Sequence, residues 1–221
     1  MKVAVIGAGY WGPNLIRNFQ SADNVDGVVA CDRDGERLEK MRKMFHGIET
    51  AEDYCEVIAR PDIDIVVIAT PVSSHHEIAK AALLAGKHCF IEKPMTASVA
   101  EAEELIELAE SKHLKLFVDH TFIYTGAVRK MKEIITSGRL GEIYYFDSVR
   151  INLGLFQHDV NVIWDLAPHD LSILDYLLEQ PRVAVPAAGS CPVGHDLEAQ
   201  AEPAPQLEEK PKAQYNITLP S

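Results

Sequence analysis

Three glycines near the start of the chain, Gly7, Gly9 and Gly12, have the spacing of a loop that binds phosphate. In the pattern G-x-G-x-x-G the first glycine allows a tight turn. The second lets the backbone approach a pyrophosphate, and the third permits close packing of a helix on a strand. The pyrophosphate would lie on the free N–H groups and the positive dipole end of that helix. The pattern predicts a dinucleotide-binding turn, which also contains Tyr10 and Trp11. A glycine-rich turn that binds no ligand is the alternative.

Asp32 ends the apolar run Val28–Cys31, a predicted strand, twenty residues after Gly12. A carboxylate at this position can accept hydrogen bonds from the ribose hydroxyls of an adenosine, and it repels a 2′-phosphate. The residue therefore predicts NAD as the cofactor in preference to NADP. NADP remains open, because Arg33 follows Asp32 directly.

Glu92, Lys93 and Pro94 directly follow the apolar run His88–Ile91, another predicted strand. A lysine held beside a bound cofactor by a strand end can place its ammonium group against a substrate hydroxyl, or against the ketone formed from it. A cis peptide bond between Lys93 and Pro94 is one possibility, since about 5% of X–Pro bonds are cis in folded proteins. From the tripeptide alone, an ordinary loop is equally compatible.

Asp165 and His169 are four residues apart and so share one face of a predicted helix. Histidine exchanges protons near neutral pH, and a carboxylate one turn away can orient its ring and favour its charged form. Pro168 is expected in the first helical turn, where its missing N–H costs little. The alternative is that Asp165 caps the helix and His169 packs in the core.

The elements that must position these residues alternate between strand and helix from residue 2 to about residue 120. That order predicts an α/β fold, a doubly wound parallel sheet that binds ligands at the carboxyl ends of its strands. Ser98 followed by Glu101 predicts a capping box at one helix start. The predicted strands are 3–6, 28–31, 64–69, 88–91 and 115–118. The first predicted helix contains Leu15 to Phe19, and the second covers 34–45. A short helix is predicted to begin at Thr50 or Glu52, and two more are predicted over 74–86 and 98–109.

The sequence changes character after residue 122. We predict helices over Thr125–Ser137 and Trp164–Leu178, a long strand over Glu142–Ile151, and at most one more strand near Arg182–Ala188. Residues 181–221 hold seven of the twelve prolines, which is typical of a linker or tail. The predicted organisation is a Rossmann domain (1–122), an incomplete α+β substrate or oligomerisation domain (123–188) and a flexible tail (189–221).

Composition excludes several classes of function. A net charge of −12 argues against binding to nucleic acid or to an anionic membrane surface. No run approaches the roughly twenty apolar residues that a membrane span needs. The first residues read as a strand and not as a signal peptide, and the four scattered cysteines indicate reduced thiols, so we expect a cytoplasmic protein without a structural metal.

Two further motifs, Ala69–His75 (ATPVSSH) and Ser137–Glu142 (SGRLGE), complete a combination that resembles the glucose-fructose oxidoreductase/inositol dehydrogenase (Gfo/Idh/MocA) family of NAD(P)-dependent dehydrogenases. The resemblance extends from Lys2 to about Leu178. It implies hydride transfer between NAD and a secondary alcohol of a sugar, cyclitol or nucleotide-linked sugar. The last class is suggested by the run Val162–Asp170.

The resemblance also implies a role for each site residue. Lys93 would anchor and polarise the reacting oxygen, and His169 would act as acid and base with Asp165 as its partner. Glu92 would lie near the nicotinamide ribose. Further residues along the cofactor would be Thr70, Pro71 and His75.

The resemblance implies a large second-domain sheet that forms the substrate floor and an oligomer interface, yet the sequence offers few strands after His169. We therefore expect a homo-oligomer only if this domain is completed. The rival hypothesis is a degenerate relative that binds a dinucleotide without catalysis, or a subunit completed by a partner.

Overall fold

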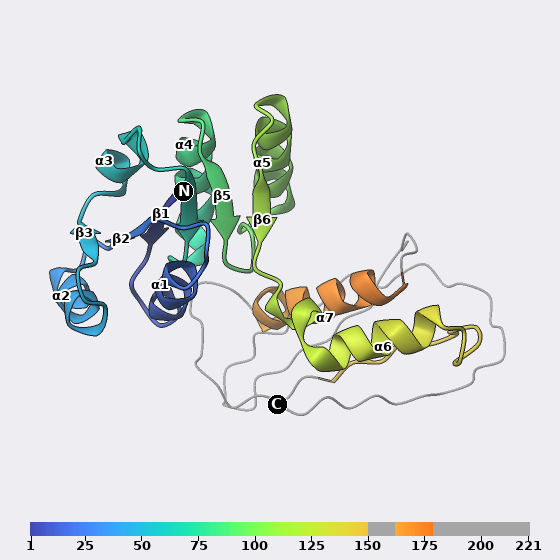
Figure 1. Cartoon of the computed structure of the whole chain (residues 1–221). Coiled ribbons are helices and arrows are strands. Elements are labelled where there is room, and N and C mark those ends of the chain that lie inside the picture. Colours follow the sequence, from blue (N-terminus) through green and yellow to red (C-terminus); the bar gives the residue numbers. More distant parts are fainter. Residues whose placement is uncertain (150–161, 179–221) are drawn as a thin grey trace, which may run out of the picture. The chain divides into compact units, whose positions relative to one another are not determined.

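A computed structural model describes residues 1–149 and 162–178, which fall into two compact units, Met1–Asp119 and His120–Ser221 (Figure 1). The first unit is built on a parallel sheet with strand order β3-β2-β1-β4-β5-β6. This is the predicted doubly wound topology, in which the order reverses between β1 and β4. The strands are β1 (Lys2–Ile6), β2 (Gly27–Cys31), β3 (Glu49–Ala51), β4 (Ile65–Ile68), β5 (His88–Ile91) and β6 (Leu116–Val118).

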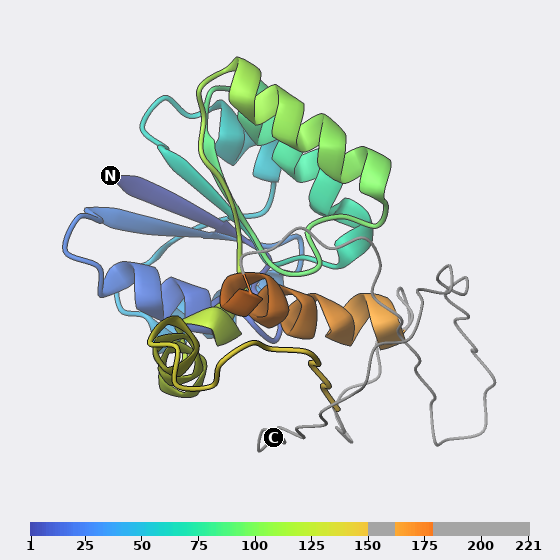
Figure 2. The same cartoon turned by 90° about the vertical axis from the view of Figure 1, so that its right-hand side faces the viewer.

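The sheet of the first unit is buried on both faces by helices (Figure 2). Val3 and Val5 of β1 pack with the helices of one face, and Ala4 and Ile6 pack with those of the other. Burial on both faces explains why the strands are continuous apolar runs, not alternating ones. One face carries α1 (Gly12–Gln20) and α2 (Gly35–Met44), and the other carries α3 (Tyr54–Ala59), α4 (His75–Leu84) and α5 (Val99–Ser111).

Side chains cap the starts of α2, α3 and α5. The predicted capping box of α5 is confirmed, since Ser98 accepts from the backbone of Glu101 and the Glu101 side chain accepts from that of Ser98. The prediction that Thr50 or Glu52 opens a helix is wrong. Thr50 lies in β3, which pairs with β2, and the helix begins only at Tyr54 because Asp53 caps it.

The second unit contains a 3₁₀ turn (Thr121–Tyr124) and two helices, α6 (Gly126–Thr136) and α7 (Val162–Leu178), close to their predicted ranges. They share a small core around Val128, Ile173 and Leu177. The prediction that Pro168 lies in the first turn of α7 is wrong. Pro168 lies inside the helix, because the helix begins at Val162, two residues before the predicted start.

The strand predicted over Glu142–Ile151 is wrong for its described part, since residues 142–149 form no strand. A strand needs a neighbour for its backbone groups, and among the described residues none pairs with this segment. Residues 150, 151, 182–188 and the predicted tail lie outside the described residues, and the predicted division into three domains stays a prediction. None of the described helices is long and apolar enough to cross a membrane.

Candidate functional site

The glycine turn between β1 and α1 needs two of its glycines for packing. Gly7 has φ +102°, and a Cβ there would lie 2.5 Å from the carbonyl oxygen of Ala69. A Cβ on Gly12 would collide with the carbonyl oxygen of Gly7. At Gly9, by contrast, the nearest atom to such a Cβ is Nη1 of Arg37 at 3.7 Å, which leaves the backbone open to an approaching ligand. The three positions thus have the turn, access and packing geometry that the pattern predicts.

The first turn of α1 is free for an anion. It contains no acidic residue, and no described side chain caps it. In contrast, Asp34, Asp53 and Ser98 cap α2, α3 and α5. The helix dipole at such a start favours a phosphate, so this part of the chain fits a pyrophosphate.

Two exposed aromatic residues stand beside this turn. The rings of Tyr10 and Trp11 stack with their centroids 6.2 Å apart. Their side chains keep 79% and 40% of their surface accessible, so both can contact a bound molecule.

Asp32 ties the end of β2 to the glycine turn. Its Oδ2 accepts from the backbone N–H of Ala8 at 2.8 Å, and its Oδ1 accepts from that of Asp34 at 2.9 Å. Its side chain is only 6% exposed. A carboxylate has about four acceptor positions, so these bonds leave capacity for ribose hydroxyls.

Arg37 was not predicted as a site residue. Its Nη1 lies 3.4 Å from Asp32 Oδ2, and like the predicted Arg33 it is exposed. The signal was present, since Asp34 caps α2 and so makes Arg37 the third residue of that helix. A side chain in a first helical turn can reach back toward the preceding strand end.

His75 joins the loops that follow β4 and β5. It is 1% exposed, with Nε2 2.8 Å from the carbonyl oxygen of Thr70 and Nδ1 2.9 Å from that of Pro94. Pro71 lies in the same loop as Thr70. The ring thereby sets the positions of two predicted cofactor-contact residues and of the Lys93–Pro94 peptide, which is cis.

Glu92 and Lys93 follow β5 directly. Glu92 Oε2 accepts from the backbone N–H of Lys93 at 3.2 Å. Burial, together with the neighbouring Asp119 carboxyl, raises the pKa of Glu92 to about 8. Asp119, which follows β6, is 7% exposed and was not predicted as a site residue.

Asp165 and His169 lie on α7 in the second unit. His169 is buried, and its ring meets that of Phe122 edge to face at a centroid distance of 4.7 Å. Asp165 is half-buried one turn earlier in the helix. The described structure therefore gathers the predicted cofactor residues in Met1–Asp119 and the acid–base pair in His120–Ser221. Joint action with Lys93 stays a prediction.

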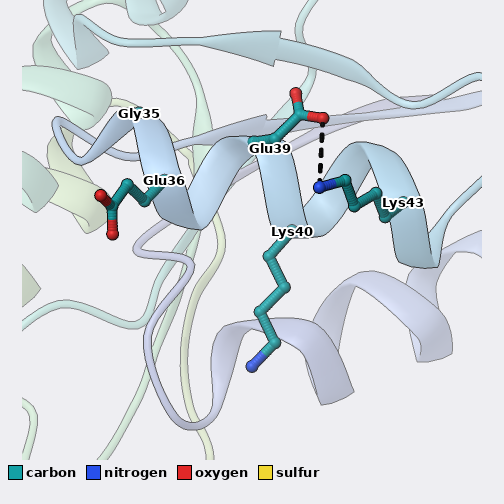
Figure 3. A pocket seen from close by; sticks show the side chains of 5 residues that line it. All are labelled: Gly35, Glu36, Glu39, Lys40 and Lys43. Atoms are coloured by element: carbon teal, nitrogen blue, oxygen red, sulfur yellow. Dashed lines mark ion pairs between the residues drawn. The ribbon is translucent and has the colours of Figure 1, made fainter.

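A shallow pocket runs along the outer side of α2, lined by Gly35, Glu36, Glu39, Lys40 and Lys43 (Figure 3). Glu39 and Lys43 form an ion pair across one helical turn at 3.7 Å. The pocket shares no residue with the strand ends and has the mixed charge of a solvated helix face.

A metal site is not evident in the described parts of the chain, and of the three cysteines there Cys31 and Cys89 are buried whereas Cys55 is exposed. There, no group of three or more His, Cys, Asp or Glu side chains could hold a metal ion. Burial raises the pKa of the Cys31 and Cys89 thiols to about 12, so both remain protonated.

Comparison with known proteins gives a family match over residues 1–120, described as an oxidoreductase family with an NAD-binding Rossmann fold. A UDP-N-acetylglucosamine 3-dehydrogenase of Acidithiobacillus ferrooxidans is 31% identical over 197 residues, covering 86% of this chain and 58% of that protein. A myo-inositol 2-dehydrogenase of Thermotoga maritima is 26% identical, covering 89% of this chain and 60% of that protein.

Among solved structures, an oxidoreductase described as putative, from Klebsiella pneumoniae, superposes with a TM-score of 0.71 at 28% identity. The match covers 85% of this chain and 52% of that one. The chain therefore spans less than two thirds of the length of each of these relatives.

Proposed function

The chain belongs to the Gfo/Idh/MocA oxidoreductase family, and from this premise we propose that it transfers a hydride between NAD and a secondary alcohol of a sugar-like substrate. The observation that carries the proposal is the glycine turn with Asp32 hydrogen-bonded to it. These residues fit the two ends of an adenosine diphosphate, whose pyrophosphate binds at the start of α1 and whose ribose binds at the end of β2.

Cofactor choice depends on two opposed side chains. The Asp32 carboxylate repels a 2′-phosphate and accepts from a 2′-hydroxyl, whereas Arg37 beside it would attract the phosphate. Because Arg37 already pairs with Asp32, its charge is partly neutralised, and we propose NAD as the preferred cofactor.

The chemistry of the reaction is divided between the cofactor and the chain. Bound NAD would supply the hydride acceptor at its nicotinamide ring. Lys93 would hold the substrate oxygen and stabilise negative charge on it, and His169 would take or return its proton, oriented by Asp165. The burial of His169 keeps competing water from its ring.

The substrate class follows from the relatives. One is named for a nucleotide-linked sugar and the other for a cyclitol, so we propose a secondary alcohol on a six-membered ring. A cytoplasmic location, and homo-oligomer formation if the second domain is completed, are part of the same proposal. The rival is a dinucleotide-binding protein without turnover, or one completed by a partner.

Titration with NADH tests the proposal, followed by nicotinamide fluorescence. The unchanged chain is expected to bind. Asp32→Ala is expected to lose about tenfold or more in affinity, since removing a charge-assisted hydrogen bond costs about 1.5–3 kcal/mol. Asp23→Ala, which removes an exposed carboxylate, is the control.

A panel of nucleotide sugars and inositols with NAD then separates the hypotheses. Turnover that Lys93→Ala and His169→Ala abolish supports the dehydrogenase. Binding without turnover supports the rival, and no binding at all would refute both.

A further inference from the structure

Two acidic side chains follow neighbouring strands of the sheet. Ile91 of β5 pairs in register with Val118 of β6, so Glu92 and Asp119 occupy equivalent positions just beyond the two strand ends. The backbone N–H of Asp119 donates to the carbonyl oxygen of Ile91 at 2.8 Å, and that of Glu92 donates to Ile68 at 2.9 Å. The sheet's own hydrogen bonds thus hold both carboxyl groups side by side.

Asp119 is almost fully withdrawn from bulk water, and Glu92 is partly withdrawn. Asp119 is 93% buried, and Oε1 of Glu92 is a buried atom that accepts no hydrogen bond from any described residue. The neighbouring Asp119 carboxyl contributes to the raised pKa of Glu92, as expected for two carboxyl groups close enough to form a hydrogen bond. Two carboxyl oxygens can form such a bond only when one of them carries a proton, and two ionised carboxylates at this separation would repel each other strongly.

The position of Glu92 and Asp119 in the sheet is where the nicotinamide half of a bound cofactor would lie. In a doubly wound sheet a dinucleotide lies across the strand ends at the point where the strand order reverses. The glycine turn and Asp32 take its adenosine half over β1 and β2. The other half must then extend over β4 and β5, where Glu92 stands.

We propose that Glu92 and Asp119 share one proton, and that loss of this proton at alkaline pH strengthens binding of the oxidised cofactor relative to the reduced one. Asp119 acts as a positioning residue through Glu92. The pair has one negative charge with the proton and two without it. The oxidised nicotinamide ring is positively charged and the reduced ring is neutral, so the added negative charge favours the oxidised form. This inference rests on the proposed function.

Other titratable groups face the same strand ends. Lys93 follows Glu92 on the same loop, His75 reaches that loop from α4 through the carbonyl oxygen of Pro94, and His120 follows Asp119 in the chain. The elevated pKa of Glu92, about 8, agrees with a shared proton that leaves in the alkaline range. Lys93 and both histidines remain in carboxyl variants, so those variants separate the titration of the pair from theirs.

The test measures the dissociation constants of NAD and NADH for the full chain between about pH 6 and about pH 10. For the unchanged chain, the ratio of the NADH constant to the NAD constant is expected to rise about tenfold over this range. Asp119→Asn and Glu92→Gln each leave a single carboxylate, so both should keep the ratio flat at its low-pH value. Asp23→Asn, at an exposed carboxylate, should keep the rise.

Infrared spectroscopy of the chain without cofactor tests the proton itself. At neutral pH the carbonyl stretch of a protonated carboxylic acid should be present, and either variant should lose it. A ratio that stays flat in the unchanged chain, or an absent carbonyl band, overturns the inference while NADH binding upholds the proposed function. Affinity lowered equally for both cofactor forms in the variants, with the pH dependence retained, would mean a merely structural role. No binding of either form at any pH overturns both.

Discussion

Arg37 touches Asp32 and borders the open side of Gly9, so it lies where the adenosine ribose would bind. Under the proposed function Asp32 would have two roles, to accept from the ribose and, through the ion pair, to restrain a cation that would otherwise attract phosphate. Substituting Asp32 alone, and then Asp32 together with Arg37, separates the effects of the two side chains.

We expect Asp32→Ser to shift the chain toward NADPH. Removing the carboxylate ends its repulsion of a 2′-phosphate and releases Arg37 to bind it, so the ratio of NADPH to NADH affinity should rise by about tenfold or more, or about 1.4 kcal/mol. Fluorescence titration with both reduced cofactors measures it. The double variant Asp32→Ser/Arg37→Ala should lose the gain. An unchanged ratio in the single variant would show that the 2′ position does not lie here.

Glu92 also makes folding stability depend on pH. Its pKa is raised from 4.5 to about 8 in the folded chain. Between these values the folded state holds a proton that the unfolded state has lost, so the free energy of unfolding falls as pH rises, by at most about 1.4 kcal/mol per pH unit. Above about pH 8 this contribution is constant.

Glu92→Gln should remove that slope. Urea unfolding at several pH values between about 5 and 8 should show the variant gaining stability relative to the unchanged chain as pH rises. Glu107→Gln, at an exposed position, is the matched control and should give a pH-independent difference. An equal difference at pH 5 and pH 8 for Glu92→Gln would contradict the assignment.

The site residues that could be predicted from the sequence are those whose role depends on residues near them in the chain. Gly7 and Asp32 directly follow strands, and Gly9, Gly12 and Lys93 come within six residues of a strand end, so an apolar run and a turn suffice to locate them. Asp119 also follows a strand, yet its importance depends on Glu92, 27 residues earlier, and therefore on the pairing of β5 with β6. Tertiary contacts of this kind leave no local pattern.

At the scale of elements, the packing of α1 on β1 decides how closely the helix start approaches the sheet. Gly12 lets the helix touch the carbonyl of Gly7, and that contact holds the first-turn N–H groups in place. Gly9 belongs to the same turn but contacts nothing closely. The two glycines should therefore respond differently to the same substitution.

We expect Gly12→Ala to destabilise the fold by about 1–3 kcal/mol, the usual cost of overpacking. Gly9→Ala should change stability by less than about 1 kcal/mol while weakening NADH binding, because its methyl group would occupy the space left for pyrophosphate. Urea unfolding and NADH titration on both variants measure this. Gly9→Ala with unchanged affinity would contradict the predicted cofactor position.

Elements with strong patterns could be predicted, and those that depend on a neighbour could not. The buried strand β4 is an uninterrupted apolar run. The edge strand β3 is three residues, Glu49 to Ala51, and exists because it pairs with β2. Conversely, residues 142–149 have strand-like composition, and among the described residues no strand pairs with them.

At the scale of the whole molecule, the first unit has its own hydrophobic cores, on the two faces of one sheet, while α6 and α7 share a separate, smaller core. Cofactor binding and turnover should therefore be separable. The family match likewise covers residues 1–120.

We expect a fragment of residues 1–122 to fold and to bind NADH with an affinity within about threefold of the full chain, less than 1 kcal/mol. The cofactor residues predicted from the sequence lie in this part, whereas the acid–base pair does not. Circular dichroism and NADH titration test the fragment. Failure of a folded fragment to bind would mean that the remaining residues contribute to the cofactor site.

Trp11, which stacks on Tyr10 in the glycine turn, should allow cofactor binding to be followed by fluorescence. Trp11 is one of only two tryptophans in the sequence, and its emission overlaps the absorption of a reduced nicotinamide. Light absorbed by Trp11 should therefore pass to bound NADH by resonance energy transfer and reappear as nicotinamide emission. Trp11→Phe should remove most of this sensitised signal, whereas Trp164→Phe, on α7, would report whatever the second unit adds. Trp11 would thus serve as an intrinsic fluorescent probe of cofactor binding, without any attached dye.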